Sequence, residues 1–300
     1  MVKQTAHVFP GGNQSRWPIV SKVPVLPVIA RSLTEILPGI RLSKIGQSET
    51  ACASLRADHY AASMEQGSEP AYWLKNAAYM VGMPVYAAML RGMSARARSD
   101  RERLSIARRV RFRGFSIRPY QVDEEILGLL DELKKRSPRR VVEIGTAQGG
   151  TLFLMLTSLP ASGHVVSIDL PRGPFGGGYA HWKIPLFHAM SWGGPRLTLL
   201  RGSSQTQEMR DRVLDVLGGP ADFILIDGDH SYGGAKRDFE LYRDIVAPGG
   251  LVAFHDIVSG TPEKVGGVPA VWRELREQYR HTEFVRDWNQ GGFGIGVLYF

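Results

Sequence analysis

Two apolar segments of the chain each end in acids and a histidine. FILIDGDH ends in Asp227, Asp229 and His230, and LVAFHD ends in His255 and Asp256. If both segments are neighbouring strands of a parallel sheet, their carboxyl ends meet at the edge where such folds bind ligands. Asp227 and Asp256 then form a candidate site for one divalent cation, with His255 as a candidate third ligand. Carboxylate oxygens suit Mg²⁺, whereas an imidazole ligand favours Mn²⁺, Fe²⁺ or Zn²⁺.

Helix capping is the alternative explanation for part of this cluster. Asp229 and Ser231 directly precede YGGAKRDFELYRDIV, which we predict to be a helix. Both residue types accept hydrogen bonds from the first turn of a helix. Capping does not require acids and histidines at the ends of two strands, so it explains Asp229 better than Asp227.

A second candidate site lies in VVEIGTAQGG, where an apolar strand ends in Glu143 and a glycine-rich turn opens a helix. Gly145 and Gly149 permit a tight turn, and the helix amino terminus offers free N–H groups to a ligand. The next strand ends in Asp169, 24 residues after Gly145, where a carboxylate can bind a ribose diol. The turn lacks the G-x-G-x-x-G register of dinucleotide sites, and Glu143 would repel a pyrophosphate. An acid there suits the cationic amino end of S-adenosylmethionine, while an ordinary strand–helix turn is the alternative.

The elements that position these residues alternate between strand and helix. We predict strands over residues 139–145, 164–170, 196–202, 222–228, 250–256 and 292–300, and helices over residues 121–135, 149–159, 204–217, 232–246 and 268–280. Strands that are apolar on both faces and alternate with helices are typical of a parallel sheet covered on both sides. Each predicted strand end places a glycine, an acid or a histidine at the ligand-binding edge.

Composition divides the 300-residue chain into three predicted parts. Residues 1–50 are rich in Pro, Gly and Ser and are expected to be irregular, residues 51–114 form a basic helical extension, and residues 115–300 form the α/β domain. The single cysteine, Cys52, excludes an internal disulfide and fits a reducing compartment. No secretory signal or membrane-spanning stretch is recognisable, so a cytoplasmic location is expected.

The net charge of +8 is unevenly distributed, because residues 140–300 hold 15 Lys and Arg against 17 Asp and Glu. The basic excess peaks in RGMSARARSDRERLSIARRVRFRG, which has nine arginines and two acids. Such a segment could contact nucleic acid, anionic lipid or an acidic partner. A solvated arginine-rich helix is the favoured interpretation, because no aromatic-rich RNA-binding signature accompanies the arginines.

Residues 115–300 resemble a class I S-adenosylmethionine-dependent methyltransferase. EIGTAQGG resembles the first motif of that family, SIDL its acidic second strand, and LLRGSSQT the adenine-binding loop of small-molecule O-methyltransferases. The resemblance is greatest to the group of metal-dependent macrolide-sugar O-methyltransferases and cephalosporin-hydroxylase-type proteins. It implies a Rossmann-like, doubly wound, mostly parallel seven-stranded sheet with helices on both faces, preceded by a mainly helical extension.

The resemblance also implies roles for individual residues. Asp227 corresponds to the acid that binds Mg²⁺, and His230 to the base three positions later. His255 and Asp256 stand where the family has an acidic pair, so Asp256 is the expected ligand and His255 departs from the pattern. The residues implied in cofactor binding are Glu143, Gly145, Thr146, Ala147, Gly149, Asp169, Ser204 and Gln205.

The insertion PRGPFGGGYAHWKIPLFHAM is too long and glycine-rich for a simple connection between a strand and a helix. We expect a lid whose Tyr179 and Trp182 contact the substrate, with a surface loop anchored by its aromatic rings as the alternative. Tyr120 and Gln121 are expected to face the cofactor cleft.

The function expected from these features is metal-dependent O-methylation of a small-molecule hydroxyl, on a glycosyl or secondary-metabolite acceptor. S-adenosylmethionine and a divalent metal, Mg²⁺ or Mn²⁺, are the expected cofactors, and a homo-oligomer is the expected assembly. An RNA methyltransferase that uses the arginine-rich segment and a catalytically inactive binding module remain as alternatives. Nucleic acid is disfavoured as a partner, because most nucleic-acid methylation does not require a metal-like cluster.

Overall fold

The computed structural model of the chain describes residues 70–112, 114–171 and 178–300, with side chains from residue 82 onward. The chain divides into two compact units, Met1–Ala62 and Ser63–Phe300, and the described residues all belong to the second. The irregular segment predicted over residues 1–50 therefore lies outside the described residues, as does the first part of the helical extension.

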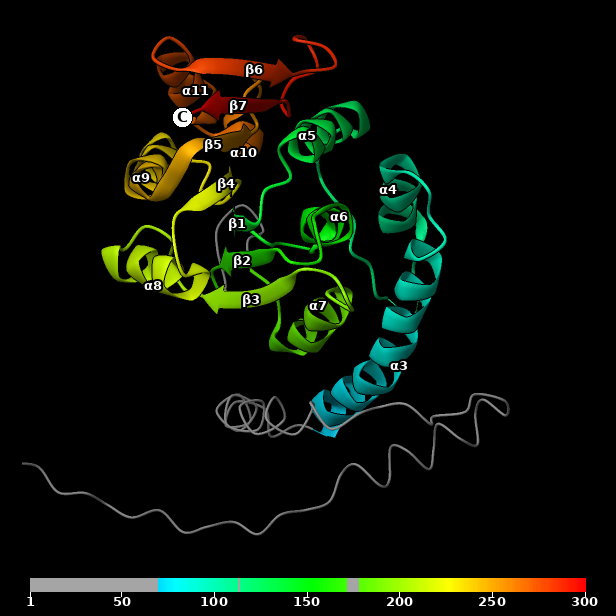
Figure 1. Cartoon of the computed structure of the whole chain (residues 1–300). Helices are drawn as coiled ribbons and strands as arrows, with labels where there is room; N and C mark the ends of the chain where they lie inside the picture. The colour runs from blue at the N-terminus through cyan, green and yellow to red at the C-terminus, as the bar shows by residue number, and fades with distance from the viewer. Residues whose placement is uncertain (1–69, 113, 172–177) are drawn as a thin grey trace, which may run out of the picture. The chain divides into compact units, whose positions relative to one another are not determined.

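One seven-stranded sheet forms the centre of the domain (Figure 1). Its order is β3-β2-β1-β4-β5-β7-β6, and only the pairs that involve β7 are antiparallel. The strands are β1 (Arg140–Ile144), β2 (His164–Asp169), β3 (Arg196–Arg201), β4 (Ala221–Ile226), β5 (Val246–His255), β6 (Arg280–Phe284) and β7 (Ile295–Tyr299). The predicted doubly wound, mostly parallel seven-stranded sheet is confirmed.

Helices cover both faces of the sheet (Figure 1). The first face carries α5 (Asp123–Arg136), α6 (Gly150–Ser158) and α7 (Ile184–Met190), and the second carries α8 (Gln207–Leu217), α9 (Tyr232–Tyr242) and α11 (Val268–Arg276). The short elements η3 (His181–Lys183), η4 (Arg243–Ile245) and α10 (Pro262–Val265) complete the connections.

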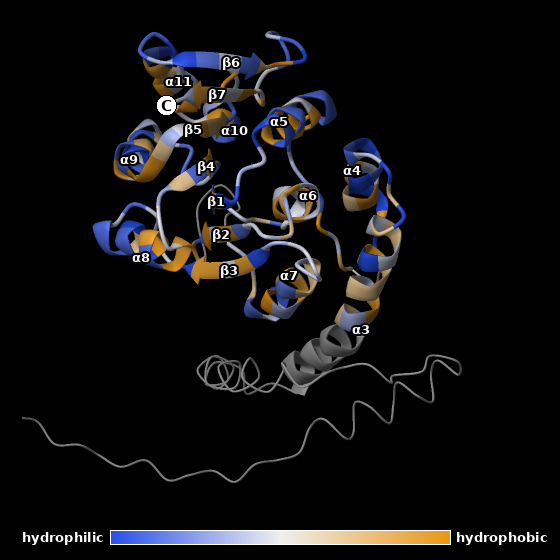
Figure 2. Ribbon diagram, in the orientation of Figure 1, coloured by the Kyte–Doolittle hydropathy of each residue, from blue (hydrophilic) through white to orange (hydrophobic). Residues whose placement is uncertain are grey.

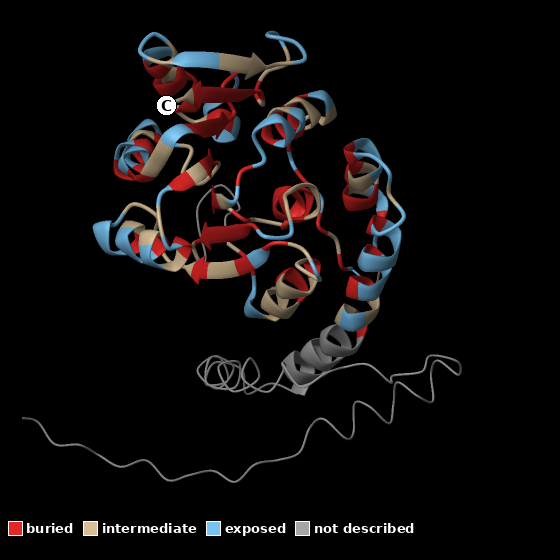
Figure 3. Ribbon diagram, viewed as in Figure 1, coloured by how far each residue is buried: buried red, intermediate tan, exposed pale blue. Residues whose placement is uncertain are grey.

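Alternation along each strand creates two separate cores. Val141 and Val165 pack with α5, α6 and α7, whereas Val142 and Val166 pack with α8, α9 and α11. Both sets are fully buried, because a parallel sheet inside two helical layers has no solvent-facing side. Figure 2 shows apolar residues on the central strands and on the sides of the helices that face them, and Figure 3 shows the same positions as buried.

The described part of the basic extension, residues 70–112, is largely helical and packs on the first face. It contains α3 (Pro70–Ser94) and α4 (Asp100–Arg109). Ser99 caps the amino terminus of α4, because its hydroxyl accepts a 3.2 Å hydrogen bond from the Glu102 N–H. The Tyr86 ring stacks on Phe115 with centroids 5.7 Å apart, and its hydroxyl donates to the Val110 carbonyl at 3.1 Å. The extension therefore shares the core of the domain.

Two segments differ from the sequence prediction by more than shifted boundaries. The helix predicted over residues 268–280 ends at Arg276, and β6 begins at Arg280 as an edge strand paired only with β7. Four of the five residues of β6 are polar and none is buried, so no apolar run marks it as a strand. The insertion predicted as a lid contains η3 and α7, and Pro185 lies in the first turn of α7. Within the described ranges no helix is both long and apolar enough to cross a membrane.

Candidate active site

The carboxyl ends of β1, β2, β4 and β5 enclose a cavity of about 460 Å³. Its wall includes most of the predicted site residues, namely Gly145, Ala147, Asp169, Ser204, Gln205, Asp227, His230, His255 and Asp256. Register explains this gathering, because Ile144 of β1 pairs with both Ile168 of β2 and Ile226 of β4. The acids that follow those strands consequently reach the same edge of the sheet.

Gly145, which follows β1, lies in close contact with Asp227, which follows β4. A Cβ atom on this residue would lie 1.9 Å from the carbonyl oxygen of Asp227, and its φ of +99° is one that other residues rarely adopt. The Gly145 N–H donates to the Ile168 carbonyl at 2.9 Å, and the Asp227 N–H donates to the Ile144 carbonyl at 2.9 Å. Only glycine fits where the end of β1 is tied to the strands on both sides.

Asp169 ends β2 and faces the cavity from a buried position. Its Oδ2 accepts a 2.8 Å hydrogen bond from the Ala147 N–H in the glycine-rich turn. Burial raises the pKa of the Asp169 carboxyl, although hydrogen bonds from backbone N–H groups such as that of Ala147 oppose the rise. The turn and the acid therefore form one unit, with a carboxylate at the cavity wall.

Glu143 lies behind the cavity wall rather than in it. It is fully buried and accepts a 2.5 Å hydrogen bond from the Ser167 hydroxyl, which also bonds the Thr146 hydroxyl at 2.5 Å. Burial, together with the charges of Asp169 and Asp227, raises the pKa of Glu143 to about 8. The structure thus gives Glu143 and Thr146 a place in a polar network that supports the turn.

Gly149 also supports the turn from outside the cavity lining. It caps α6 with a φ of +83°, and a Cβ atom there would lie 2.5 Å from the Phe187 ring. Of the residues predicted to bind the cofactor, Gly145, Ala147, Asp169, Ser204 and Gln205 line the cavity. The other three, Glu143, Thr146 and Gly149, lie behind the wall, where Glu143 and Thr146 share the Ser167 hydroxyl and the Gly149 N–H donates to the Thr146 carbonyl.

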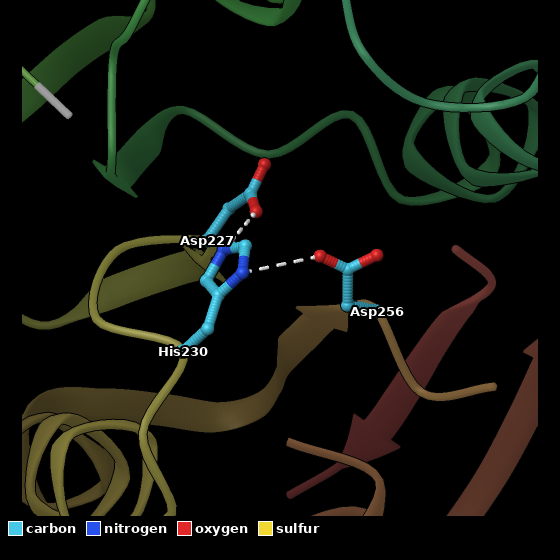
Figure 4. A group of neighbouring side chains, drawn as sticks. All are labelled: Asp227, His230 and Asp256. Atoms are coloured by element: carbon cyan, nitrogen blue, oxygen red, sulfur yellow. Dashed lines mark ion pairs between the residues drawn. The ribbon is translucent and has the colours of Figure 1, made fainter. Parts of the chain in front are cut away.

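A cluster of two carboxylates and an imidazole occupies the other half of the cavity (Figure 4). Asp227, His230 and Asp256 each offer one atom, and all three atoms lie within 4.8 Å of one another. The His230 ring lies between the acids, with Nε2 3.4 Å from Asp227 Oδ1 and Nδ1 3.3 Å from Asp256 Oδ2. Asp256 has a φ of +62°, a strained conformation of the kind found at functional sites.

His255 approaches the same two oxygens from a more buried position. Its Nδ1 is 3.1 Å from Asp227 Oδ1 and 3.4 Å from Asp256 Oδ2. The side chain is 4% exposed, against 16% for His230. The sequence prediction placed His255 among the metal ligands and His230 outside them, whereas the structure brings both rings to one pair of carboxylates.

The charged groups of the cluster shift one another's pKa values. Burial alone would raise the pKa of Asp227, but the charges and hydrogen bonds of His255 and His230 lower it well below its usual range. Burial alone would lower the pKa of both histidines, but Asp227 and Asp256 raise it. Two carboxylate oxygens and an imidazole nitrogen that all lie within 4.8 Å of one another are a donor set that fits one divalent cation.

Asp229 lies beside the cluster and has a different role. Its Oδ1 accepts the Ser231 N–H at 2.9 Å, and its Oδ2 accepts the Gln205 side-chain amide at 3.1 Å. Ser231 caps α9 by accepting the Gly234 N–H at 3.0 Å. The capping interpretation therefore holds for Ser231, while Asp229 orders the turn and orients Gln205 of the cavity wall.

The two aromatic residues predicted to contact substrate are packed into the first face. Tyr179 is 3% exposed, and its ring lies 4.9 Å from that of Phe187 in an edge-on contact. Trp182 makes a similar contact with Phe115 at 5.3 Å. Neither ring belongs to the cavity wall, so in the described part of the insertion the geometry supports anchoring by aromatic rings.

Tyr120, which was expected to face the cleft, lines the cavity and is 58% exposed. Gly202, Ser203, Lys264 and Phe293 also line the cavity and were not predicted as site residues. Phe293 has a φ of +64°, and the surrounding GGFG was the available sign of an unusual turn.

Comparison with known proteins agrees with this geometry. Residues 142–257, which include the glycine-rich turn and the acids of β2, β4 and β5, match the family model described as a methyltransferase domain. No curated protein sequence matches the chain significantly.

Solved structures show more distant likeness. The O-methyltransferase TomG from Streptomyces achromogenes, solved with S-adenosylmethionine, is 18% identical over 68% of this chain and 91% of its own, with a TM-score of 0.47. An O-methyltransferase from Bacillus cereus, solved with S-adenosylhomocysteine, is 14% identical over 82% of this chain and 97% of its own, also with a TM-score of 0.47. The family match identifies residues 142–257 as a methyltransferase domain, and the strand order is the doubly wound one that the resemblance to class I S-adenosylmethionine-dependent methyltransferases implies.

Proposed function

We propose that the chain is an S-adenosylmethionine-dependent O-methyltransferase that requires a divalent metal and acts on a hydroxyl of a small molecule. The observation that carries the proposal is that one cavity is lined both by the carboxylate of Asp169 and by the Asp227–His230–Asp256 cluster. A methyl donor and an acceptor hydroxyl need such adjacent sites, because the two reactants must meet in line.

The methyl donor would occupy the half of the cavity formed by β1 and β2. Gly145 and Ala147 supply a close backbone wall, and Asp169 supplies a carboxylate for the ribose diol. Ser204 and Gln205 lie at the end of β3, where the adenine would be placed. Gln205 is held in position by Asp229.

The acceptor would occupy the half formed by β4 and β5. Asp227 and Asp256 would hold the cation, with His255 as a third donor from its buried position. A divalent cation bound there would lower the pKa of the acceptor hydroxyl.

His230, the more exposed of the two histidines, takes the hydroxyl proton in this mechanism. The Lys264 carbonyl, 3.1 Å from Nδ1, accepts a hydrogen bond from that nitrogen and so orients the ring. The acceptor oxygen then forms its bond to the methyl carbon as the carbon–sulfur bond breaks, which leaves S-adenosylhomocysteine.

Two arginines of the basic segment that suggested the RNA methyltransferase alternative form ion pairs within the fold. Arg103 forms an ion pair with Asp100 at 2.8 Å, and Arg108 forms one with Asp123 at 2.5 Å. These arginines therefore join α4 to itself and to the start of α5. The acceptor, the homo-oligomer and the cytoplasmic location stay predictions.

Calorimetry with S-adenosylmethionine and with Mn²⁺ tests the proposal on the wild type, Asp227→Asn and the matched variant Asp229→Asn. Removing the Asp227 charge should weaken Mn²⁺ binding at least 100-fold and leave cofactor affinity within about threefold, because Asp227 lies in the acceptor half. Asp229→Asn should leave Mn²⁺ binding intact.

An acceptor screen among glycosides and polyols, read as S-adenosylhomocysteine formed with and without a chelator, then identifies the substrate class. A wild type that binds the cofactor but no divalent cation would contradict the metal-dependent mechanism.

A further inference from the structure

Each carboxylate of the cluster has one oxygen that faces the imidazoles and one that faces away. Asp227 Oδ1 and Asp256 Oδ2 are the inner oxygens, since both histidine rings contact this pair. The outer oxygens, Asp227 Oδ2 and Asp256 Oδ1, each accept a hydrogen bond from elsewhere in the fold. These outer contacts decide how the inner pair is oriented.

Gln121 holds the outer oxygen of Asp227. Its side-chain amide donates to Asp227 Oδ2 at 2.9 Å, and its own carbonyl oxygen accepts the Thr151 hydroxyl at 2.9 Å. Gln121 is 3% exposed, so water does not compete for these bonds. Because both ends of the amide are bound, the Asp227 carboxylate cannot rotate without breaking a buried hydrogen bond.

The outer oxygen of Asp256 is held through a loop. The Phe293 N–H donates to Asp256 Oδ1 at 3.0 Å. Buried Glu125 fixes this loop by accepting three hydrogen bonds, from the Arg286 N–H at 3.2 Å, the Gln290 amide at 2.6 Å and the Gly294 N–H at 2.8 Å. The strained Phe293 backbone therefore depends on Glu125 for its position.

Both supports come from one short segment at the start of α5, and α4 anchors that segment. Arg108 donates to the carbonyls of Gln121 at 2.5 Å and Pro119 at 3.3 Å, in addition to its ion pair with Asp123. A continuous path of hydrogen bonds thus leads from the basic extension to Asp227.

We propose that Gln121 and Glu125 are positioning residues that hold the inner oxygens of Asp227 and Asp256 at the spacing a cation requires. The proposal rests on the proposed metal-dependent function and assigns the extension a role in it. Groups that orient metal ligands through hydrogen bonds typically contribute 10- to 100-fold to metal affinity. Gln121 bonds a carboxylate directly, whereas Glu125 acts through Phe293, so Gln121 should contribute more.

Mn²⁺ titration of Gln121→Met tests the direct support, because methionine keeps the side-chain size and removes both hydrogen bonds. Mn²⁺ affinity should fall at least 10-fold, and the electron paramagnetic resonance spectrum of bound Mn²⁺ should broaden as the ligands lose their fixed orientation. Gln278→Met, the same change at an exposed helix end, should alter neither result. S-adenosylmethionine affinity should stay within about threefold in both variants.

Glu125→Gln tests the indirect support and should lower Mn²⁺ affinity three- to tenfold, because the new amide group would oppose the Gly294 N–H. A purely structural role would lower the unfolding temperature and leave Mn²⁺ affinity and spectrum unchanged. Folded Gln121→Met and Glu125→Gln proteins with wild-type Mn²⁺ affinity would overturn this inference alone. A wild type without Mn²⁺ affinity would overturn it together with the proposed function.

Discussion

The two edges of the same sheet carry opposite chemistry. At the amino edge, β1, β2 and β3 begin with Arg140, His164 and Arg196, which are direct neighbours in the strand register. At the carboxyl edge, β2 ends in Asp169 and β4 is followed by Asp227. Basic side chains therefore gather where β1, β2 and β3 begin, and acids gather where β2 and β4 end.

The basic groups at the amino edge serve the fold. Arg196 donates to the Val216 carbonyl at 2.9 Å, in the last turn of α8, where carbonyls have no partner within the helix. It also bonds His164 Nδ1 at 2.8 Å. At the carboxyl edge the acids converge on one another instead, around a cavity. Charged groups that converge around a cavity are better candidates for a binding site than charged groups that bond the backbone.

Histidines show the contrast most directly. Burial and the charge of Arg196 lower the pKa of His164 to about 4, whereas Asp227 and Asp256 raise the pKa of His230 and His255. All three side chains are buried or half-buried, so the sign of the neighbouring charge decides the difference. A buried histidine alone therefore indicates no function.

Replacing glycines at the two edges should have the largest effect, which is on the free energy of unfolding. Gly145→Ala should destabilise the protein by about 3 kcal/mol or more, because the new Cβ would overlap the Asp227 carbonyl. Gly218→Ala, at the end of α8, has a similar left-handed backbone but no atom within 4 Å of the new Cβ. It should cost about 1 kcal/mol. Urea unfolding measures both, and equal losses would contradict the close contact between β1 and β4.

Replacing acids at the two edges should have a smaller effect, which is on cofactor affinity at the carboxyl edge and on stability at the amino edge. Asp169→Asn should weaken S-adenosylmethionine binding by about 10- to 100-fold, since a charged acceptor contributes about 1.5–3 kcal/mol to a hydrogen bond. Asp222→Asn is the matched change at the amino edge, where Asp222 accepts the N–H groups of Arg139 and Arg140 at 2.8 Å each. It should change stability by less than about 1 kcal/mol and leave cofactor affinity unchanged. Cofactor affinity lost in both variants would remove the distinction between the edges.

The smallest effect concerns the pH dependence of stability. The pKa of folded His164, about 4, lies below its unfolded value of about 6.5, so the unfolded chain binds the extra proton between these values. His164 therefore costs stability as pH falls from 6.5 to 4.

Replacing His164 with Gln should flatten this part of the profile by about 1 kcal/mol, a figure reduced because solvent screens part of the interaction. Thermal unfolding at pH 4–7 compares the two proteins. Parallel profiles would show that His164 titrates normally in the fold.

The sequence was most informative where local pattern and global position coincide. Buried parallel strands are continuous apolar runs, so the segments that end at Asp169, Asp227 and Asp256 were recognisable, and the parallel arrangement placed their acids at one edge. The edge strand β6 lacked that signal because half-exposed polar residues form it. Tyr179 and Trp182 were predicted as substrate contacts, with anchoring as the alternative, because aromatic rings in a glycine-rich insertion serve either role and only their packing against Phe187 and Phe115 distinguishes the two.

The sequence by itself determined the doubly wound sheet, the glycine-rich turn and the acids at the strand ends, because these depend on the order of residues along single elements. Only the tertiary structure decided which groups orient those acids. Gln121 lies 106 positions from Asp227, and Glu125 lies 169 positions from the Gly294 that it binds. No periodicity links residues so far apart, because their contacts arise only when α5 packs on the sheet. The chemistry of the site is thus encoded locally, and its geometry is set by packing.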